Sequence, residues 1–224
     1  QNDPLGRHAT AFVASREGVQ AGVVMTGGQF NKFFGGTFYE RTGTYTAPTA
    51  PPDRFDVTYH GTYAAGLNTV GPETDLLPTG GGLDPDVDVP TQTAYIRGLM
   101  FVNVDLNDLS VEGEIYNRTG VLVNNTGDPA DVPGFIGLPD IVLVEGQLAD
   151  DGSFTGNLEI DGQVGDDIGD FAGLIGGPAG ESLVGGTTLT EFEDSFENEI
   201  EYGVFVLDLC QPGDTSAVCT NVLP

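Results

Sequence analysis

Positive charge is what this sequence has least of. Its 224 residues include only 7 Lys and Arg, with Lys32 the one lysine, against 34 Asp and Glu. The resulting net charge of -27 repels phosphate backbones and anionic headgroups, so it argues against nucleic-acid binding and electrostatic docking to membranes. Two interpretations remain: solubility in salty water, where ions screen self-repulsion within about 10 Å, or attraction of a basic partner or a divalent cation.

Histidine and methionine, the side chains most relevant to haem ligation, are also scarce, with two of each. His8 and His60 are the only histidines, and His60 falls on the polar face of an expected strand. This placement favours an exposed histidine, with haem or metal ligation as the alternative. Met25 and Met100 are better suited to core packing than to haem ligation. Because no G-x-S-x-G or comparable motif is present, we expect no enzymatic activity.

The two cysteines, Cys210 and Cys219, enclose a short turn-forming loop near the end of the chain. Cysteines so placed predict a disulfide in an oxidising compartment, with free thiols as the alternative. Metal binding is disfavoured because no second pair of Cys or His residues lies near them. No segment approaches the roughly 20 apolar residues of a membrane span. The start at Gln1-Asn2-Asp3 suits an exported protein whose leader has been removed.

Glycine and proline are abundant, at 34 and 14 residues, while 39% of the chain is hydrophobic. Such a composition predicts a turn-dense all-β domain with enough apolar surface for a core. The clearest hairpin runs from Ile141 to Ile160, where Val144, Gly146 and Leu148 alternate with polar or small residues. An Asp-Gly pair supplies its turn. Other expected strands are 8–15, 19–26, 33–46, 55–63, 100–106, 111–115 and 200–209.

Several glycines fall on faces expected to point inward. A glycine inside a strand costs packing and entropy, and strong coiling of a small closed barrel is a reason to accept that cost. Closure also removes exposed sheet edges. We therefore predict one closed antiparallel barrel whose inward glycines are Gly61, Gly113, Gly146, Gly156 and Gly173.

Two long stretches with little strand signal, 66–91 and 120–139, are expected to be binding loops. In the first, Asp84, Asp86 and Asp88 alternate in a proline-containing loop. Carboxylates in a flexible loop suit calcium, and a solvated acidic loop is the alternative. A dense aromatic cluster before the first barrel motif could form either a core or a ligand surface; its members are Phe30, Phe33, Phe34, Phe38 and Tyr39.

Three motifs occur in an order that resembles a known family. They are VTYHGTY (57–63), DGSFTG (151–156) and FAGLIGGPAGESLVGG (171–186). In this order they resemble the barrel domain of bacterial transferrin-binding protein B and related surface lipoproteins, including haem-binding and factor H-binding relatives. The resemblance covers roughly 55–209, which is most of the chain.

This resemblance implies an eight-stranded antiparallel up-and-down β-barrel over residues 53–224, with a smaller handle-like β region over residues 1–52. It also implies export to the cell surface through an outer-membrane translocator, and a lipid anchor outside the given chain. The expected function is that of a monomeric, non-enzymatic surface or secreted protein that binds a protein or small-molecule ligand, in nutrient or iron and haem acquisition. One alternative is a haem carrier with a pocket between handle and barrel. Another is a structural or adhesive protein.

Overall fold

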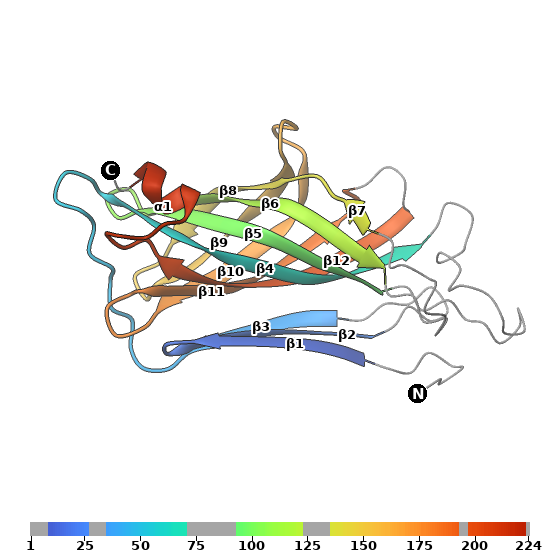
Figure 1. Cartoon of the computed structure of the whole chain (residues 1–224), viewed down its shortest axis with the longest axis horizontal. Coiled ribbons are helices and arrows are strands. Elements are labelled where there is room, and N and C mark those ends of the chain that lie inside the picture. Colours follow the sequence, from blue (N-terminus) through green and yellow to red (C-terminus); the bar gives the residue numbers. More distant parts are fainter. Residues whose placement is uncertain (1–8, 27–34, 71–92, 123–134, 193–196, 223–224) are drawn as a thin grey trace, which may run out of the picture.

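The structure is a computed structural model that describes residues 9–26, 35–70, 93–122, 135–192 and 197–222 (Figure 1). Three N-terminal strands form a separate sheet in the order β1-β2-β3: β1 (Ala9–Arg16), β2 (Val19–Thr26) and β3 (Gly35–Arg41). The later strands are β4 (Asp56–Val70), β5 (Thr93–Asp105), β6 (Ser110–Leu122), β7 (Phe135–Gly137), β8 (Ile141–Leu148), β9 (Ser153–Ile160), β10 (Asp167–Gly176), β11 (Ser182–Thr190) and β12 (Glu197–Leu209). A short helix, α1 (Ala217–Val222), follows them.

Eight of the later strands close into a barrel. Their order is β5-β4-β12-β11-β10-β9-β8-β6, and the ring closes because β5 also pairs with β6. Every pairing is antiparallel, while β7 pairs with β6 outside the ring. The predicted fold class, an eight-stranded antiparallel barrel with a smaller N-terminal β region, is confirmed. No helix among the described residues is long and apolar enough to cross a membrane.

Short polar turns connect the hairpins where the sequence predicts them. Gly18 has φ 79° in the two-residue turn between β1 and β2. Between β8 and β9, Gly152 also has φ 79°, and the Ser153 N–H donates to Asp151 Oδ1 at 3.0 Å. Glycine tolerates this left-handed backbone, and aspartate side chains accept bonds from nearby amides. Local chemistry thus specifies both turns.

One face assignment in the first arm of the β8–β9 hairpin is wrong. Strict alternation puts Val144 on the same face as Gly146 and Leu148, yet the pairing register shifts between Val144 and Gln147. Leu143 is buried before the shift and Leu148 after it, whereas Val144 is only partly buried. A β-bulge inserts an extra residue into one strand, so the inward parity changes across it.

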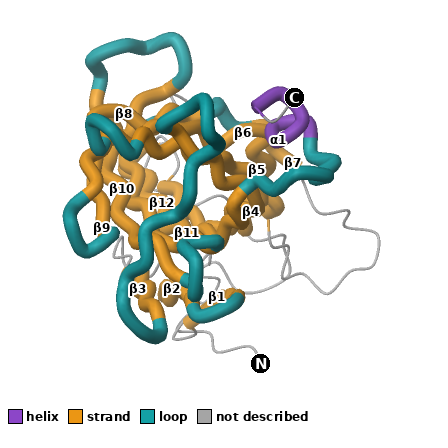
Figure 2. Tube along the Cα trace, turned by 90° about the vertical axis from the view of Figure 1, so that its left-hand side faces the viewer, coloured by secondary structure: helices purple, strands orange, loops and turns teal. Residues whose placement is uncertain are grey.

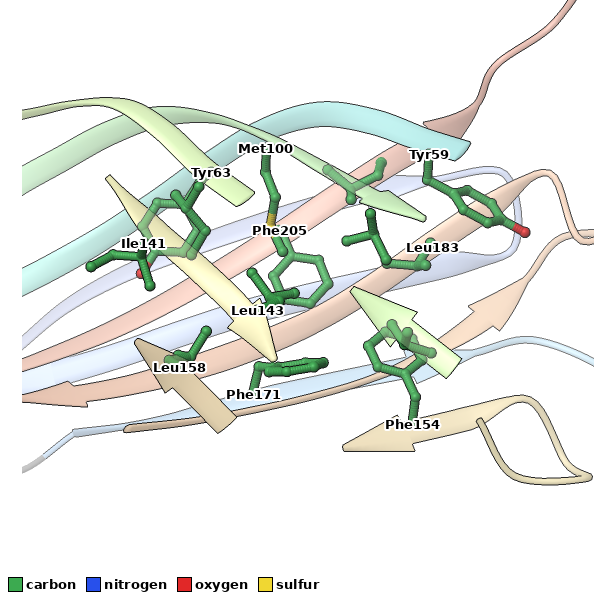
Figure 3. Packing of buried hydrophobic residues seen from close by; sticks show 14 of the residues in the cluster. Tyr59, Tyr63, Met100, Ile141, Leu143, Phe154, Leu158, Phe171, Leu183 and Phe205 are labelled. Carbon is green, nitrogen blue, oxygen red and sulfur yellow. The ribbon is translucent and has the colours of Figure 1, made fainter. Parts of the chain in front are cut away.

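Large apolar side chains fill the interior of the barrel (Figure 3). Two of the predicted inward glycines lie opposite aromatic residues, Gly156 opposite Phe171 and Gly173 opposite Phe154. A Cβ at Gly156 would lie 2.5 Å from the Phe171 ring, and one at Gly173 would lie 2.4 Å from the Phe154 ring. Each ring occupies the space that its partner glycine leaves, so the two side chains fill a narrow barrel together. The interior is therefore a core.

Candidate functional site

The N-terminal sheet packs against the outside of the barrel wall (Figure 2). Period-two alternation puts four buried apolar side chains of β2 on the face that meets the barrel: Val19, Ala21, Val23 and Met25. They form a second core cluster with Val184 of β11 and Val204 of β12. The same strands thus contribute to two cores, one on each side of the wall.

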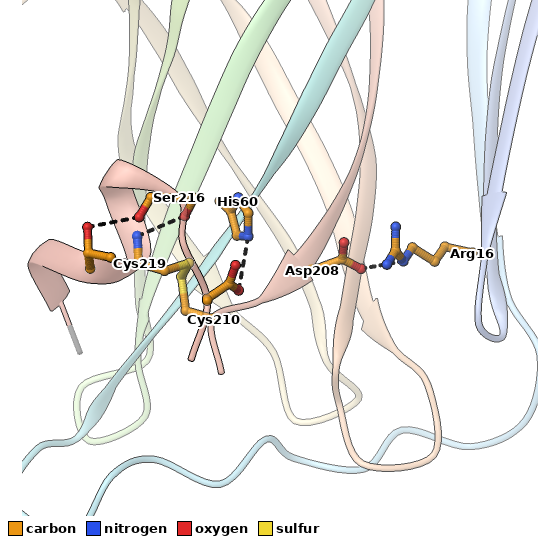
Figure 4. A network of polar contacts seen from close by, with 8 residues as sticks. Arg16, His60, Asp208, Cys210, Ser216 and Cys219 are labelled. Carbon is orange, nitrogen blue, oxygen red and sulfur yellow. Dashed lines mark hydrogen bonds and ion pairs between the residues drawn. A yellow bond between two sulfur atoms is a disulfide. The ribbon is translucent and has the colours of Figure 1, made fainter. Parts of the chain in front are cut away.

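Glycines on the outer wall receive side chains of the sheet. A Cβ at Gly66 would lie 1.7 Å from Met25 Sδ, and one at Gly186 would lie 2.5 Å from Thr37 Oγ1. At the hairpin end of the sheet, Arg16 Nε forms an ion pair with Asp208 of β12 at 2.6 Å (Figure 4). These contacts fix the position of the sheet on the barrel, and hence the position of β3.

A groove lies beside β3, between this strand and the outer wall formed by β9, β10 and β11. Its volume is about 630 Å³, within the range of ligand pockets. Polar side chains line it from both walls, beside apolar surface: Thr37 and Tyr39 from β3, and Thr155, Asn157, Asp170 and Thr188 from the barrel. Figure 2 shows β3 on the side of the barrel that carries β9 and β10.

The groove offers hydrogen-bonding chemistry. Its hydroxyl and amide groups both donate and accept, and Asp170 adds a carboxylate acceptor. Asn157 Nδ2 donates to Asp167 Oδ2 at 3.2 Å, which holds the orientation of the Asn157 amide. Tyr39 contributes an aromatic ring beside these polar groups. Such a surface suits a polar ligand held by several hydrogen bonds.

The strand beside the groove, β3, is an edge of its sheet. It pairs with β2, and no strand among the described residues pairs with its other side. The Thr42 N–H donates to Gly18 O at 2.7 Å just beyond the last pair, Arg41 with Val19. In an antiparallel ladder the hydrogen-bonded and non-bonded pairs alternate. The backbone N–H and C=O groups of Thr37, Tyr39 and Arg41 therefore point away from β2.

A buried polar cluster lies inside the barrel, within the apolar core. Arg118 Nη2 and Glu201 Oε2 form a 2.6 Å ion pair, and both side chains have 0% exposure. The Tyr63 hydroxyl donates to Glu201 Oε1 at 2.6 Å and lies 2.8 Å from Thr187 Oγ1. Burial, and then the charge of Glu201, raise the pKa of Tyr63 well above its ordinary value. Because these groups are closed off from solvent, the cluster links β4, β6, β11 and β12 rather than offering a binding surface.

The predicted disulfide between Cys210 and Cys219 is present. His60 lies beside it, with Nε2 3.4 Å from Asp214 Oδ2 (Figure 4). Nitrogen and sulfur ligand atoms of this trio lie within 4.8 Å of one another, but the disulfide leaves no thiolate for a metal or for nucleophilic attack. His60 does not line the groove. Haem binding by His60 stays a prediction.

Other predicted binding residues fall partly outside the described chain. Asp84, Asp86 and Asp88, proposed for calcium, lie there, and so do Phe30, Phe33 and Phe34. The predicted loop 66–91 begins too early, because β4 continues to Val70. Met25 and Met100 are core residues, as expected. Of the aromatic cluster, Tyr39 lines the groove, whereas Phe38 is 43% exposed and covers Gly22.

Sequence reasoning missed the barrel side of the groove. Thr155 and Asn157 stand at alternating polar positions of β9, a pattern that also describes any solvated strand face. The only available signal was the run of short hydroxyl and amide side chains on one outward face. What distinguishes that face is the sheet docked beside it, a long-range contact that a local pattern does not contain.

No family model matches this sequence, and no curated protein sequence matches it. Among solved structures, the chain is similar to transferrin-binding protein B of Haemophilus parasuis, with 15% identity, a TM-score of 0.41, and coverage of 91% of this chain and 37% of that one. It is also similar to the protein of Actinobacillus pleuropneumoniae, with 13% identity, a TM-score of 0.43, and coverage of 88% and 80%. For serogroup B Neisseria meningitidis the identity is 13%, the TM-score 0.40, and the coverage 90% and 35%. The chain thus spans little more than a third of the Haemophilus and Neisseria chains.

Proposed function

We propose that this protein is a non-enzymatic ligand-binding protein, exported to the cell surface or secreted, that holds a polar ligand in the groove between β3 and the barrel wall. The groove itself carries the proposal. It is open, about 630 Å³ in volume and lined by hydrogen-bonding side chains from two separate sheets. The barrel interior, by contrast, is packed with buried apolar side chains.

The disulfide and the charge support the proposed location. A disulfide persists in an oxidising compartment, which favours export. A net charge of -27 keeps a protein soluble outside the cell and discourages association with phosphate-rich surfaces. A role in nutrient or iron uptake is one form that this function could take, and an exported structural or adhesive protein is the alternative.

Filling the groove tests the proposal. Thr155 is exposed on the groove side of β9, so Thr155→Arg places a long side chain in the ligand volume without disturbing the core. Thr62→Arg is the matched control, because Thr62 is an exposed strand threonine on β4 away from the groove. We expect the wild-type protein and Thr62→Arg to retain the same probes on an array of defined glycans and peptides, and Thr155→Arg to lose at least tenfold in affinity.

Two results would contradict this proposal. One is equal retention of every probe by the two arginine variants, which would place binding elsewhere on the molecule. The other is the absence of any retained probe, which would favour the structural or adhesive alternative. Circular dichroism of each variant establishes that the β-fold is intact.

A further inference from the structure

We propose that the ligand of the groove is an extended, basic peptide segment that joins the open edge of β3 as a fourth strand of the N-terminal sheet. This inference rests on the proposed function and names the chemistry of the ligand. Its basis is the juxtaposition of three features: a strand edge without a partner strand among the described residues, a groove on that same side, and an acidic environment.

The backbone of β3 is arranged to pair with another strand. Its pairing with β2 runs without a register shift from Gly35 to Arg41. The outward N–H and C=O groups of Thr37, Tyr39 and Arg41 therefore recur at every second residue, the pattern that an added strand requires. Seven residues of regular strand can pair with a segment of similar length. Unlike many natural edges, the described strand has neither a proline nor a bulge to block pairing.

The groove provides the space for such a strand. Neighbouring strands lie about 4.8 Å apart, so a fourth strand would occupy the volume directly beside β3. Its side chains would alternate between solvent and the barrel wall, where Thr155, Asn157 and Asp170 form the polar floor. Main-chain bonds to β3 would provide affinity, and floor contacts would select the side chains.

Charge decides between the possible occupants. Asp170 lines the groove and Glu40 projects from the exposed positions of β3. Arg41, the cation within β3, is already engaged, since its Nη1 donates to Ile175 O at 3.0 Å and its guanidinium lies over the Tyr45 ring. A second copy of this chain would bring another net charge of -27 to the same edge. A lysine- or arginine-bearing segment of a partner protein is instead attracted.

A paired substitution at Thr37 tests the backbone contact. Thr37→Pro removes an N–H that makes no bond to β2, so pairing within the sheet is preserved. The proline ring obstructs the open edge of β3. Thr37→Val keeps that N–H and the side-chain shape. The probe is a blocked nine-residue peptide in which lysine alternates with threonine; its glutamate-for-lysine and proline-for-threonine versions are controls. Both variants lack the Thr37 hydroxyl, which lines the groove, so the difference between them reports on the backbone contact alone. We expect Thr37→Val to retain binding of the lysine peptide.

Thr37→Pro should bind the lysine peptide at least tenfold more weakly than Thr37→Val does. Both control peptides should bind to the wild-type protein at least tenfold more weakly than the lysine peptide. Should Thr37→Pro fold poorly, amide hydrogen exchange on the wild-type protein gives an independent readout. The lysine peptide should slow exchange of the Thr37 and Tyr39 amides, which face the groove, more than exchange of the Phe38 amide, which faces β2. Unchanged exchange at Thr37 and Tyr39, or equal binding by the Pro and Val variants, would overturn the inference.

The experiments distinguish failure of the groove as a binding site from failure of the added strand on β3. If Thr155→Arg abolishes binding of an array probe that Thr37→Pro still binds, the groove is a binding site but the added strand is wrong. If Thr155→Arg leaves all binding unchanged, the proposed function itself fails. Sedimentation velocity tests whether a second copy of this chain occupies the edge instead. A dimer of the wild-type protein that Thr37→Pro dissociates would show that it does, which also overturns the inference.

Discussion

The inner and outer faces of the barrel wall at β9 and β10 differ in chemistry although the same strands form both. Inward residues such as Phe154 and Phe171 are almost completely buried against glycines. Outward residues of the same strands, Thr155 and Asp170, are polar and exposed. Because a strand alternates its side chains, one sequence satisfies both requirements. The inner face is filled by buried apolar side chains, so we assign the proposed ligand binding to the outer face.

The proposed site is the part of the outer face that has the N-terminal sheet beside it. Around most of the barrel, an outward threonine is a solvated strand residue. Next to β3, outward polar residues of β9 and β10 share a groove with Thr37 and Tyr39. Docking of the N-terminal sheet, through Met25 against Gly66 and Thr37 against Gly186, is what separates this part of the wall from the rest.

The largest effect is expected from the inner face, at the buried ion pair. Arg118→Met would leave Glu201 as a buried carboxylate whose cation is gone. Removing one partner of a buried pair destabilises a protein by about 3–5 kcal/mol. We expect urea unfolding to report a loss of this size, whereas Thr155→Arg on the outer face should change the free energy of unfolding by less than about 0.5 kcal/mol.

A double variant separates the ion pair from the space that it fills. Arg118→Met with Glu201→Leu removes both charges, and replacement of a buried pair by apolar residues is often neutral. Most of the lost stability should therefore return. If the single Arg118→Met variant is as stable as the wild-type protein, the inner face of the wall is no more sensitive to substitution than the outer face, and the prediction is wrong.

Much of this architecture could be predicted from the sequence because its signals are local. The Asp-Gly turn before Ser153 and the alternation of β9 and β12 are encoded in neighbouring residues. The bulge after Val144 was missed because one inserted residue reverses parity without a composition signal. The helix α1 was also not predicted, since it has only six residues and one of them, Cys219, is held by the disulfide to Cys210.

The candidate site was less predictable for the same physical reason. The predicted pocket between handle and barrel has a counterpart in the groove, but its lining residues come from segments more than a hundred positions apart, such as Thr37 and Thr155. Similarly, neither Arg118 nor Glu201 stands out as inward-facing until the ring closes and brings β6 and β12, which β5 and β4 separate in the ring, to one core. Such pairings are long-range and leave no periodic trace in the sequence.

An intermediate effect is expected where the sheet meets the barrel. Gly66→Val would place side-chain atoms where Met25 lies, so either the sheet moves outward or Met25 leaves its position. Overpacking of this kind costs about 1–3 kcal/mol. We expect Gly66→Val to accelerate amide hydrogen exchange more in β1, β2 and β3 than in the barrel strands. Ligand binding in the groove should also be weaker than in the wild-type protein.

Gly36→Val is the matched control for this substitution. Gly36 is an exposed strand glycine of β3, and no atom lies within 4 Å of a Cβ built there. It should leave hydrogen exchange of the sheet unchanged or slow it slightly, since valine suits a strand better than glycine does. Equal effects of the two valine substitutions would mean that the position of the sheet does not depend on the Gly66 contact.

The smallest effect is expected at alkaline pH, and it again probes the inner face. Burial raises the pKa values of Tyr59 and Tyr63 in the folded protein, while tyrosines of the unfolded chain ionise near pH 10. Above that pH the unfolded state binds fewer protons than the folded state, so stability falls as pH rises, by about 1.4 kcal/mol per pH unit for each such tyrosine. Stability below pH 10 should not depend on these groups' ionisation.

Urea unfolding of Tyr63→Phe between pH 10 and 11.5 tests this expectation. The slope of the free energy of unfolding against pH should be shallower than that of the wild-type protein by about this amount. Tyr59→Phe should behave alike, because its hydroxyl is also buried and donates to Gly180 O at 2.6 Å. A slope that neither substitution changes would mean that solvent reaches the barrel interior, and a ligand site inside the barrel would then compete with the groove.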